Sequence, residues 1–192
     1  MRIFTFILFL ILISLETQSQ NIDFYREDLR FKLNENKFEV EGHYYFRNNL
    51  NRPLRLKLKY PFPNDSIFGE INSVQCIDLT DSSSTISFIE QDYMMFKISI
   101  PANESKAYRI SYHQNLKSNK ASYILTTTNQ WGKAFEQATY ELSVENLIID
   151  SLSYIPDKVE VFDDSSKFYW QKENFMPDRN FEVFFHKKQQ NE

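Results

Sequence analysis

The stretch KFEVEGHYYF, residues 37–46, alternates between two kinds of side chain at every second position. One set is apolar or small and comprises Phe38, Val40, Gly42, Tyr44 and Phe46. The other set is mostly polar and comprises Glu39, Glu41, His43 and Tyr45. Successive side chains of a β-strand point to opposite faces, so this pattern predicts a strand with one buried and one solvated face.

The next run, PLRLKLKYPF at residues 53–62, has the same period, with Lys57 and Lys59 on its polar face. The residues between the two runs, NNLNR, have turn chemistry. We therefore expect a hairpin between the two runs. It would place Glu39 and Glu41 beside the lysines, which is a favourable cross-strand arrangement.

Alternation continues to the end of the chain. It recurs in residues 29–33, 96–100, 108–112, 138–144, 158–162, 167–171 and 180–186. No window of a dozen residues carries the i, i+3, i+4 apolar stripe of a helix. The pattern predicts an all-β protein, an antiparallel β-sandwich of about ten to twelve strands. Repeats, low-complexity segments and flexible linkers are absent, so we expect one domain over residues 20–192.

The first residues, MRIFTFILFLILISLETQSQ, combine one basic residue with an apolar run from Ile3 to Leu15. This run is too short to span a bilayer, which takes roughly 20 residues, and it fits the apolar region of a secretory signal. Small side chains at Thr17 and Ser19 predict cleavage after Ser19, which leaves 192 − 19 = 173 residues. We expect export to the periplasm or the extracellular space, with no membrane span after cleavage. An uncleaved anchor is the alternative.

The net charge of −4 argues against a nucleic-acid partner, because such partners usually require a basic face. Cys76 is the only cysteine, so no intramolecular disulfide can form. Cys76 has the same strand parity as Val74, and we expect a buried, unreactive thiol. The stability of the fold should therefore come from its aromatic core.

Several kinds of catalysis lack their sequence signatures. Glycine occurs only at positions 42, 69 and 132, which leaves no G-x-S-x-G elbow and no glycine-rich phosphate loop. The zinc-protease motif H-E-x-x-H is also missing. We predict no catalytic residue, no cofactor and no metal site.

The remaining polar candidates have simpler interpretations. The three histidines, His43, His113 and His186, fall on outward faces of separate strands, and we expect them to be solvated surface residues. The pairs Asp78/Asp81 and Asp163/Asp164 could suggest paired carboxylates or a calcium site. Each pair lies beside serines, and we interpret both as turn residues that bond their own backbone.

The stretch YILTTTNQWGKAFEQATYEL, residues 123–142, interrupts two strand-like patterns with Trp131 and Gly132. Gly132 can adopt the positive φ that a corner requires. The indole of Trp131 could present a flat surface to a ligand, or it could cover the open end of the core. We favour the second interpretation and expect Trp131 to plug one end of the sandwich.

Two stretches resemble known families. VEGHYYFRNNLNRPLRLKLKYPFP resembles the opening of extracytoplasmic β-sandwich domains. The Trp-turn stretch, together with YWQKENFMPDRNFEVFF, is similar to a secreted bacterial family of unassigned function, with a Tyr-x-Leu-x-Thr strand, a Trp turn and an Ala-x-Tyr strand. The layout also resembles the N-terminal β-domain of zinc aminopeptidases, whose catalytic half this chain lacks. These resemblances imply a fold and transfer no activity.

The leading interpretation is a non-catalytic protein of the cell envelope that binds another protein or a surface component. The alternative is a hydrolase or carbohydrate-binding protein whose site combines carboxylates and aromatics from separate strands. A third possibility is a subunit completed by a partner at a sheet edge. A deep pocket with converging acidic groups would favour the alternative, and a flat surface would favour the binder.

Overall fold

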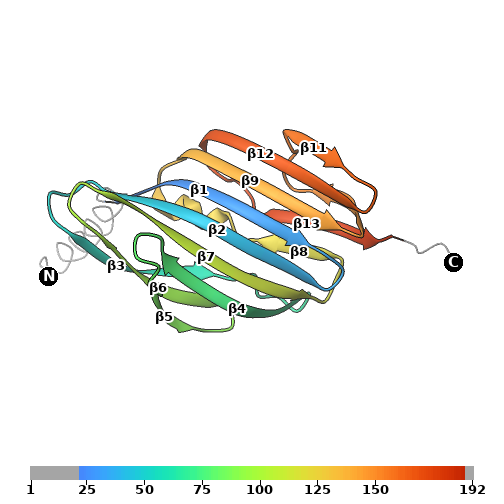
Figure 1. Cartoon of the computed structure of the whole chain (residues 1–192), viewed down its shortest axis with the longest axis horizontal. Helices are drawn as coiled ribbons and strands as arrows, with labels where there is room; N and C mark the ends of the chain where they lie inside the picture. The colour runs from blue at the N-terminus through green and yellow to red at the C-terminus, as the bar shows by residue number, and fades with distance from the viewer. Residues whose placement is uncertain (1–21, 189–192) are drawn as a thin grey trace, which may run out of the picture.

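A computed structural model describes residues 22–188 of the chain (Figure 1). The proposed signal segment and its cleavage point therefore lie outside the described residues. The strands β1 to β7 are Ile22–Leu33, Lys37–Asn48, Leu54–Pro61, Phe68–Asp78, Ile86–Ile89, Tyr93–Ile100 and Ser105–Leu116. The 3-10 helix η1 (Thr126–Trp131) follows β8 (Lys120–Tyr123). The strands β9 to β13 are Phe135–Glu145, Leu147–Leu152, Lys158–Val161, Ser165–Phe175 and Phe181–Lys187. No helix between residues 22 and 188 is long and apolar enough to cross a membrane.

The strands form two layers. A seven-stranded sheet with the order β11-β12-β9-β1-β2-β7-β4 faces the viewer in Figure 1. Two three-stranded sheets, β10-β13-β8 and β3-β6-β5, lie behind it. The predicted all-β sandwich is confirmed, with thirteen strands among the described residues where the sequence suggested about ten to twelve. The prediction of purely antiparallel pairing is wrong at one place, because β1 pairs with β9 in parallel.

The predicted hairpin between residues 38–46 and 54–62 does not form. Strand β2 pairs with β1 and β7, whereas β3 pairs with β6 in the other layer. The buried amide of Asn48 explains the change of layer, because its Nδ2 lies 2.9 Å from the carbonyl of Arg52 and 2.8 Å from that of Pro101. These bonds hold a connection that crosses between the layers. Glu41 consequently pairs with Arg30 of β1, at 3.7 Å, and not with the lysines of β3.

The core lies between the two layers and is rich in aromatic rings. The apolar face predicted from residues 38–46 is buried along its whole length. The ring of Phe31 stacks on Phe38 at 5.3 Å and on Phe181 of the opposite layer at 4.6 Å. Ring pairs at these distances contribute attraction beyond the area they bury. One contiguous cluster of buried apolar side chains therefore joins the three sheets.

An irregularity near the start of β1 sets the positions of its side chains. The register with β2 shifts between Phe24 and Arg26, so Tyr25 has no partner of its own across the pair. Such a bulge lets residues on either side of it face the same way. Phe24 packs on the core from one side of the bulge, and Glu27 lies buried in the core on the other. A carboxyl group is thereby placed on the apolar face of the sheet.

Candidate functional site

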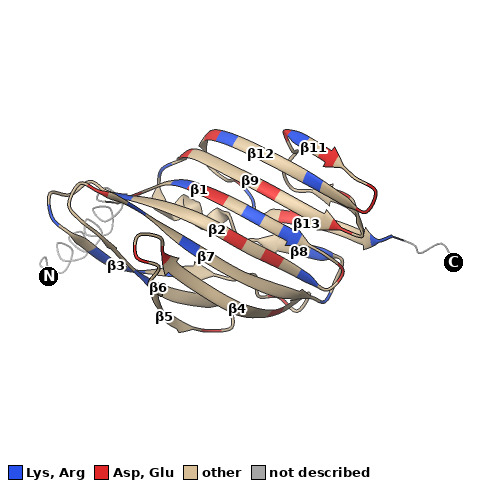
Figure 2. Ribbon diagram, in the orientation of Figure 1, with Lys and Arg blue, Asp and Glu red and all other residues tan. Residues whose placement is uncertain are grey.

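The outer face of the seven-stranded sheet carries polar side chains in rows across its central strands. In one row, Arg30 of β1 lies between Glu41 of β2 and Glu141 of β9. In the next, Asp28 lies between His43 and Thr139 on the same two strands. Figure 2 shows charges of both signs side by side on these strands. The strand alternation that buries the core thus also builds a charged outer surface.

Ion pairs and hydrogen bonds hold this outer surface in place. The guanidinium of Arg26 contacts Asp28 at 2.8 Å and lies 4.8 Å from the ring centre of Tyr45. The hydroxyl of Thr139 donates to Asp28 at 2.6 Å. Towards the edge of the sheet, Lys172 contacts Asp157 at 2.8 Å. These side chains are therefore ordered before any ligand arrives.

A hollow of about 660 Å³ lies over this part of the sheet. Its polar lining comes from β1, β2, β9, β11 and β12 and the turn before β11: Arg26, Asp28, Arg30, Glu41, His43, Tyr45, Thr139, Glu141, Asp157, Lys158, Tyr169 and Gln171. Carboxylates and tyrosines from separate strands thus meet in one place, as the alternative interpretation of the sequence required. The volume is in the usual range for a ligand site.

The acids of this hollow whose pKa values are shifted favour the ionised form. Burial alone would raise the pKa of Asp28, but hydrogen bonds from Arg26 and Thr139 outweigh it, and the net pKa is lowered. A hydrogen bond from Lys172 and one from the backbone of Gln171 lower the pKa of Asp157. Both groups are carboxylates at neutral pH. They can accept hydrogen bonds and hold cations, but they hold no proton to donate.

Directly beneath this surface lies a second polar group, the side chain of Glu27. It is 2% exposed, and the hydroxyl of Tyr140 donates to its Oε1 at 2.7 Å. Burial raises the pKa of Glu27 to about 8. The group is therefore mostly protonated at pH 7. Among residues 22–188, Tyr140 is the one group that donates a hydrogen bond to this carboxyl.

Three tyrosine hydroxyls lie in the same part of the core. The hydroxyl of Tyr44 is 2.9 Å from that of Tyr60 and 2.8 Å from that of Tyr123. The ring of Tyr44 lies against Gly42, and a Cβ at this position would meet the ring unless the ring moved. The three tyrosines come from β2, β3 and β8, and their hydrogen bonds join both layers.

A cavity of about 60 Å³ lies among Glu27 and these tyrosines. Apolar and aromatic side chains complete its walls, and Thr127, Thr128 and Trp131 of η1 line one end of it. The indole of Trp131 packs 5.7 Å from Phe24 and 5.7 Å from Phe46 and is partly buried. Gly132 follows with φ 67°, a left-handed conformation that glycine adopts at little cost. Trp131 thus lies at one end of the core, over a polar cavity.

Two details of the Trp131 region differ from the sequence expectation. The strand expected to reach Thr127 ends at Tyr123, and residues 126–131 form the 3-10 helix instead. The side chain of Asn180 accepts a hydrogen bond from the Thr126 hydroxyl at 3.0 Å. At the far end, Lys133 contacts Asp23 at 2.5 Å. Both ends of the segment are therefore tied to strands or turns of the sandwich.

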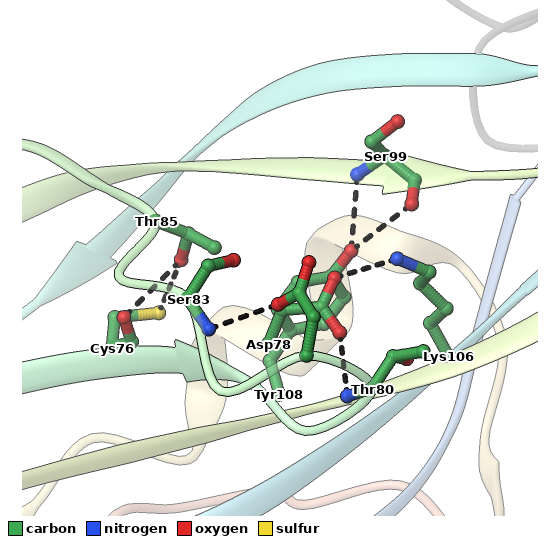
Figure 3. A network of polar contacts seen from close by, with 9 residues as sticks. Cys76, Asp78, Thr80, Ser83, Thr85, Ser99, Lys106 and Tyr108 are labelled. Atoms are coloured by element: carbon green, nitrogen blue, oxygen red, sulfur yellow. Dashed lines mark hydrogen bonds and ion pairs between the residues drawn. The ribbon is translucent and has the colours of Figure 1, made fainter.

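The region of Cys76 and Asp78 is a closed polar network, seen in Figure 3. The hydroxyl of Thr85 lies 3.1 Å from the Cys76 sulfur, and burial raises the pKa of this thiol to about 11. Asp78 accepts hydrogen bonds from the backbone of Thr80 at 2.9 Å and from Lys106 at 2.7 Å. The predicted burial of Cys76 and turn role of Asp78 are confirmed. Each of these groups therefore already has a hydrogen-bond partner within the fold.

The other predicted candidates remain apart. His43 and His113 lie on the outer face of the large sheet, and His186 lies on β13, where it contacts Asp150 at 2.6 Å. Asp81 accepts a hydrogen bond from the backbone of Ser83, as turn chemistry predicts. Within residues 22–188 no three His, Cys, Asp or Glu side chains are placed to share a metal ion.

Sequence reasoning missed Glu27, although a signal was present. The alternation of Leu29, Phe31 and Leu33, extended back by one step, reaches Glu27 on the buried face. The bulge at Tyr25 ends the pattern there, so the run looked like a strand that begins at Leu29. A charged residue in phase with a buried face is the signal that identifies such a group.

Comparison with known proteins gives a family match without a function. A family model described as a domain of unknown function (DUF4424) matches residues 90–184, a little under half of the chain. The match runs from just before β6 into β13 and includes Trp131. No curated protein matches the sequence. The sequence's resemblance to a family of unassigned function is thus supported.

Solved structures show the same fold at low sequence identity. A Legionella pneumophila protein provisionally described as nutrient-binding has a TM-score of 0.62 and 14% identity. The match covers 86% of this chain and 67% of that protein. An M1 zinc metallopeptidase from Deinococcus radiodurans, bound to a Tyr-Ser-Ala substrate, has a TM-score of 0.53 and 8% identity. The match covers 86% of this chain and 43% of the peptidase. At these identities the likeness concerns the fold alone.

Proposed function

We propose that this protein is an exported, non-catalytic binding module that holds a protein or another cell-envelope component on the outer face of its large sheet. The observation that carries the proposal is the hollow of about 660 Å³ over β1, β2 and β9, with its ion-paired side chains. Ordered charges of both signs fit a partner that presents charges of both signs, and they give specificity more than raw affinity.

The state of the carboxylates favours binding over catalysis. Glycoside hydrolysis usually needs one carboxylic acid that is protonated at working pH, beside a second carboxylate. In the hollow, Asp28 and Asp157 have lowered pKa values. Glu27 carries the proton that such chemistry needs, but it points to the other side of the sheet, into the core. Neither Asp28 nor Asp157 is therefore suited to the role of the protonated acid.

Capture of partners from intact envelopes tests this proposal. The purified protein is used as bait, and retained material is identified by mass spectrometry. Arg30→Glu reverses the charge between Glu41 and Glu141 in the hollow. Lys57→Glu makes the same change at an exposed position of β3, on another sheet, and is the matched control. A component kept by wild type and Lys57→Glu but lost by Arg30→Glu supports the proposal; equal retention by all three contradicts it.

Carbohydrate binding is the second candidate, favoured by Tyr45 and Tyr169 at the hollow. Aromatic rings beside carboxylates are a common way to hold a sugar. A glycan array with wild type and Tyr169→Ala tests this function. Specific retention that the substitution abolishes would favour a glycan partner over a protein partner. Release of shortened glycan from the array would show hydrolysis and contradict the non-catalytic assignment.

Export is tested separately, by N-terminal sequencing of protein recovered outside the cytoplasm. The expected first residue is Gln20. Recovery of an intact Met1 would contradict cleavage of a signal peptide.

A further inference from the structure

We propose that the cavity between Glu27 and Trp131 binds a small organic ammonium ion, with the Glu27 carboxylate as its counter-ion. This site lies inside the sandwich, on the opposite side of β1 from the outer hollow, and it does not depend on the partner proposed above.

One oxygen of the Glu27 carboxyl group is free to bind a ligand. Its Oε1 accepts from Tyr140, and within residues 22–188 no group donates to Oε2. In the described part of the chain, no lysine or arginine contributes to its pKa shift either. Lys59 contributes to the cavity wall, but its ammonium lies 4.0 Å from the ring centre of Tyr93, outside the core. A buried carboxyl without a counter-ion stays neutral, and an incoming cation would allow it to ionise.

The rest of the cavity suits an ammonium with one or more methyl groups. Seven aromatic residues contribute to the walls: Phe24, Tyr44, Phe46, Tyr60, Phe96, Tyr123 and Trp131. Ring faces attract cations, and the attraction is strongest where water is excluded. Tyrosine hydroxyls can accept hydrogen bonds from an ammonium. Aromatic rings are a recognised means of holding such ions, and the Glu27 carboxylate would add a counter-charge.

The size of the cavity limits the ligand. A water molecule needs about 10–15 Å³ of such space, and the cavity offers about 60 Å³. A molecule of a few heavy atoms, such as methylammonium, therefore fits without opening the two layers. Entry would take place at the side where η1 lies, because Thr127, Thr128 and Trp131 are the residues of a short helix that cover the cavity.

The affinity should depend on pH in a defined direction. The titratable groups near Glu27 are Asp28 on β1, Tyr44 on β2, Tyr60 on β3, Tyr123 on β8 and Tyr140 on β9. Burial raises the pKa of all four tyrosines well above 10, and the pKa of Asp28 is lowered. Glu27 is then the group that titrates between pH 6 and 9, with a pKa of about 8. Since the cation binds the ionised form, affinity rises about tenfold per pH unit up to pH 8 and then levels.

Isothermal titration calorimetry with methylammonium chloride tests the site. Methanol, which has nearly the same shape and no charge, is the matched ligand control, and sodium acetate is the anionic control. We expect saturable binding of methylammonium alone, with release of about one proton at pH 7, measured in buffers of different ionisation enthalpy.

Two variants separate the inner site from the outer face. Glu27→Gln keeps the shape of the protonated side chain and should weaken methylammonium binding by at least about tenfold, the loss expected for one buried charge partner. Glu39→Gln changes a carboxyl farther along the outer face, where it is paired with Lys37, and should leave the affinity unchanged. Equal binding by wild type and Glu27→Gln, preference for methanol or acetate, or the absence of saturable methylammonium binding to folded wild type would each overturn the proposal.

Discussion

Glu27 and Asp28 are adjacent residues with the same functional group and opposite environments. Glu27 points into the core, where burial raises its pKa to about 8. Asp28 points to the outer face, where Arg26 and Thr139 overcome the effect of partial burial and its pKa is lowered. One step along a strand thus separates a neutral acid from a carboxylate. The difference shows that strand parity, more than residue type, sets the chemistry each side of this sheet can offer.

The largest expected effect comes from Glu27→Gln, measured as stability against pH. The folded pKa of Glu27, about 8, is above the ordinary value of 4.5, so the folded state holds the proton more tightly. The stabilisation of the folded state by this proton is complete below pH 4.5 and is lost as the pH rises to 8. The loss is at most about 5 kcal/mol, at 1.36 kcal/mol per pH unit.

Denaturant titrations at several pH values would measure this effect. Wild type should weaken between pH 5 and 8, and Glu27→Gln should follow a flatter curve and become the more stable form at pH 8.5. Parallel curves for the two proteins would show that Glu27 is already ionised in the folded state.

Trp131→Ala should have the second largest effect. The indole contacts Phe24 and Phe46, and its removal would widen the cavity that it lines. Truncation of a large buried aromatic costs about 3–5 kcal/mol. We expect about 3 kcal/mol, the low end of that range, because part of the indole is exposed. The denaturation midpoint measures the loss, with Trp131→Phe as the milder control. Unchanged stability with abolished partner binding would identify the indole as a ligand surface.

Tyr44→Phe tests the hydrogen bonds inside the core. The substitution removes the hydroxyl that links Tyr60 and Tyr123 and leaves those two groups short of a partner. Leaving buried polar groups unpaired costs about 1–3 kcal/mol. Thermal or chemical denaturation measures the loss. A control substitution, Tyr45→Phe, alters the next tyrosine on the outer face and should cost less. Equal losses would mean that the buried hydroxyl of Tyr44 contributes no more to stability than the hydroxyl of Tyr45 on the outer face.

Asp28→Asn should have the smallest effect of the four. The group is partly exposed, and solvent screens its ion pair with Arg26, so the expected loss is about 1 kcal/mol or less. The pH dependence has the opposite sign to that of Glu27. Because the folded pKa is lowered, the stabilisation is present above pH 4 and is lost as the pH falls further. Denaturation at pH 3 and pH 7 checks this, since wild type and variant should converge at the lower pH.

The sequence predicted the faces of strands better than their partners. Alternation from Phe38 to Phe46 identified the buried side correctly, because parity is a local property. The pairing of β2 with β7 and the parallel pairing of β1 with β9 depend on long-range packing, which no local pattern records. The hairpin prediction failed for this reason, since the amide of Asn48 directs the chain into the other layer.

The same holds for the candidate site: the face of each residue was predictable from the sequence, and its neighbours on other strands were not. Charged positions on the outer faces were identifiable, but which charges meet, such as Arg30 with Glu41, depends on strand order. The Trp131–Gly132 turn could be located from the sequence alone. The cavity beneath it could not, because Glu27, Tyr60 and Tyr123 come from three different sheets.

The parallel pairing of β1 with β9 also bears on how the chain reaches its native state. Every pair in this ladder joins residues 111 positions apart, such as Leu33 with Val144. The two strands are neighbours near the centre of the large sheet. One edge of β1 pairs with β2, and its other edge has no partner until β9 has formed. Closing such a long loop is entropically costly before contacts compensate for it. Folding should accordingly be slow, on a scale of milliseconds to seconds, and until it ends the edge of β1 stays open to pairing with other chains.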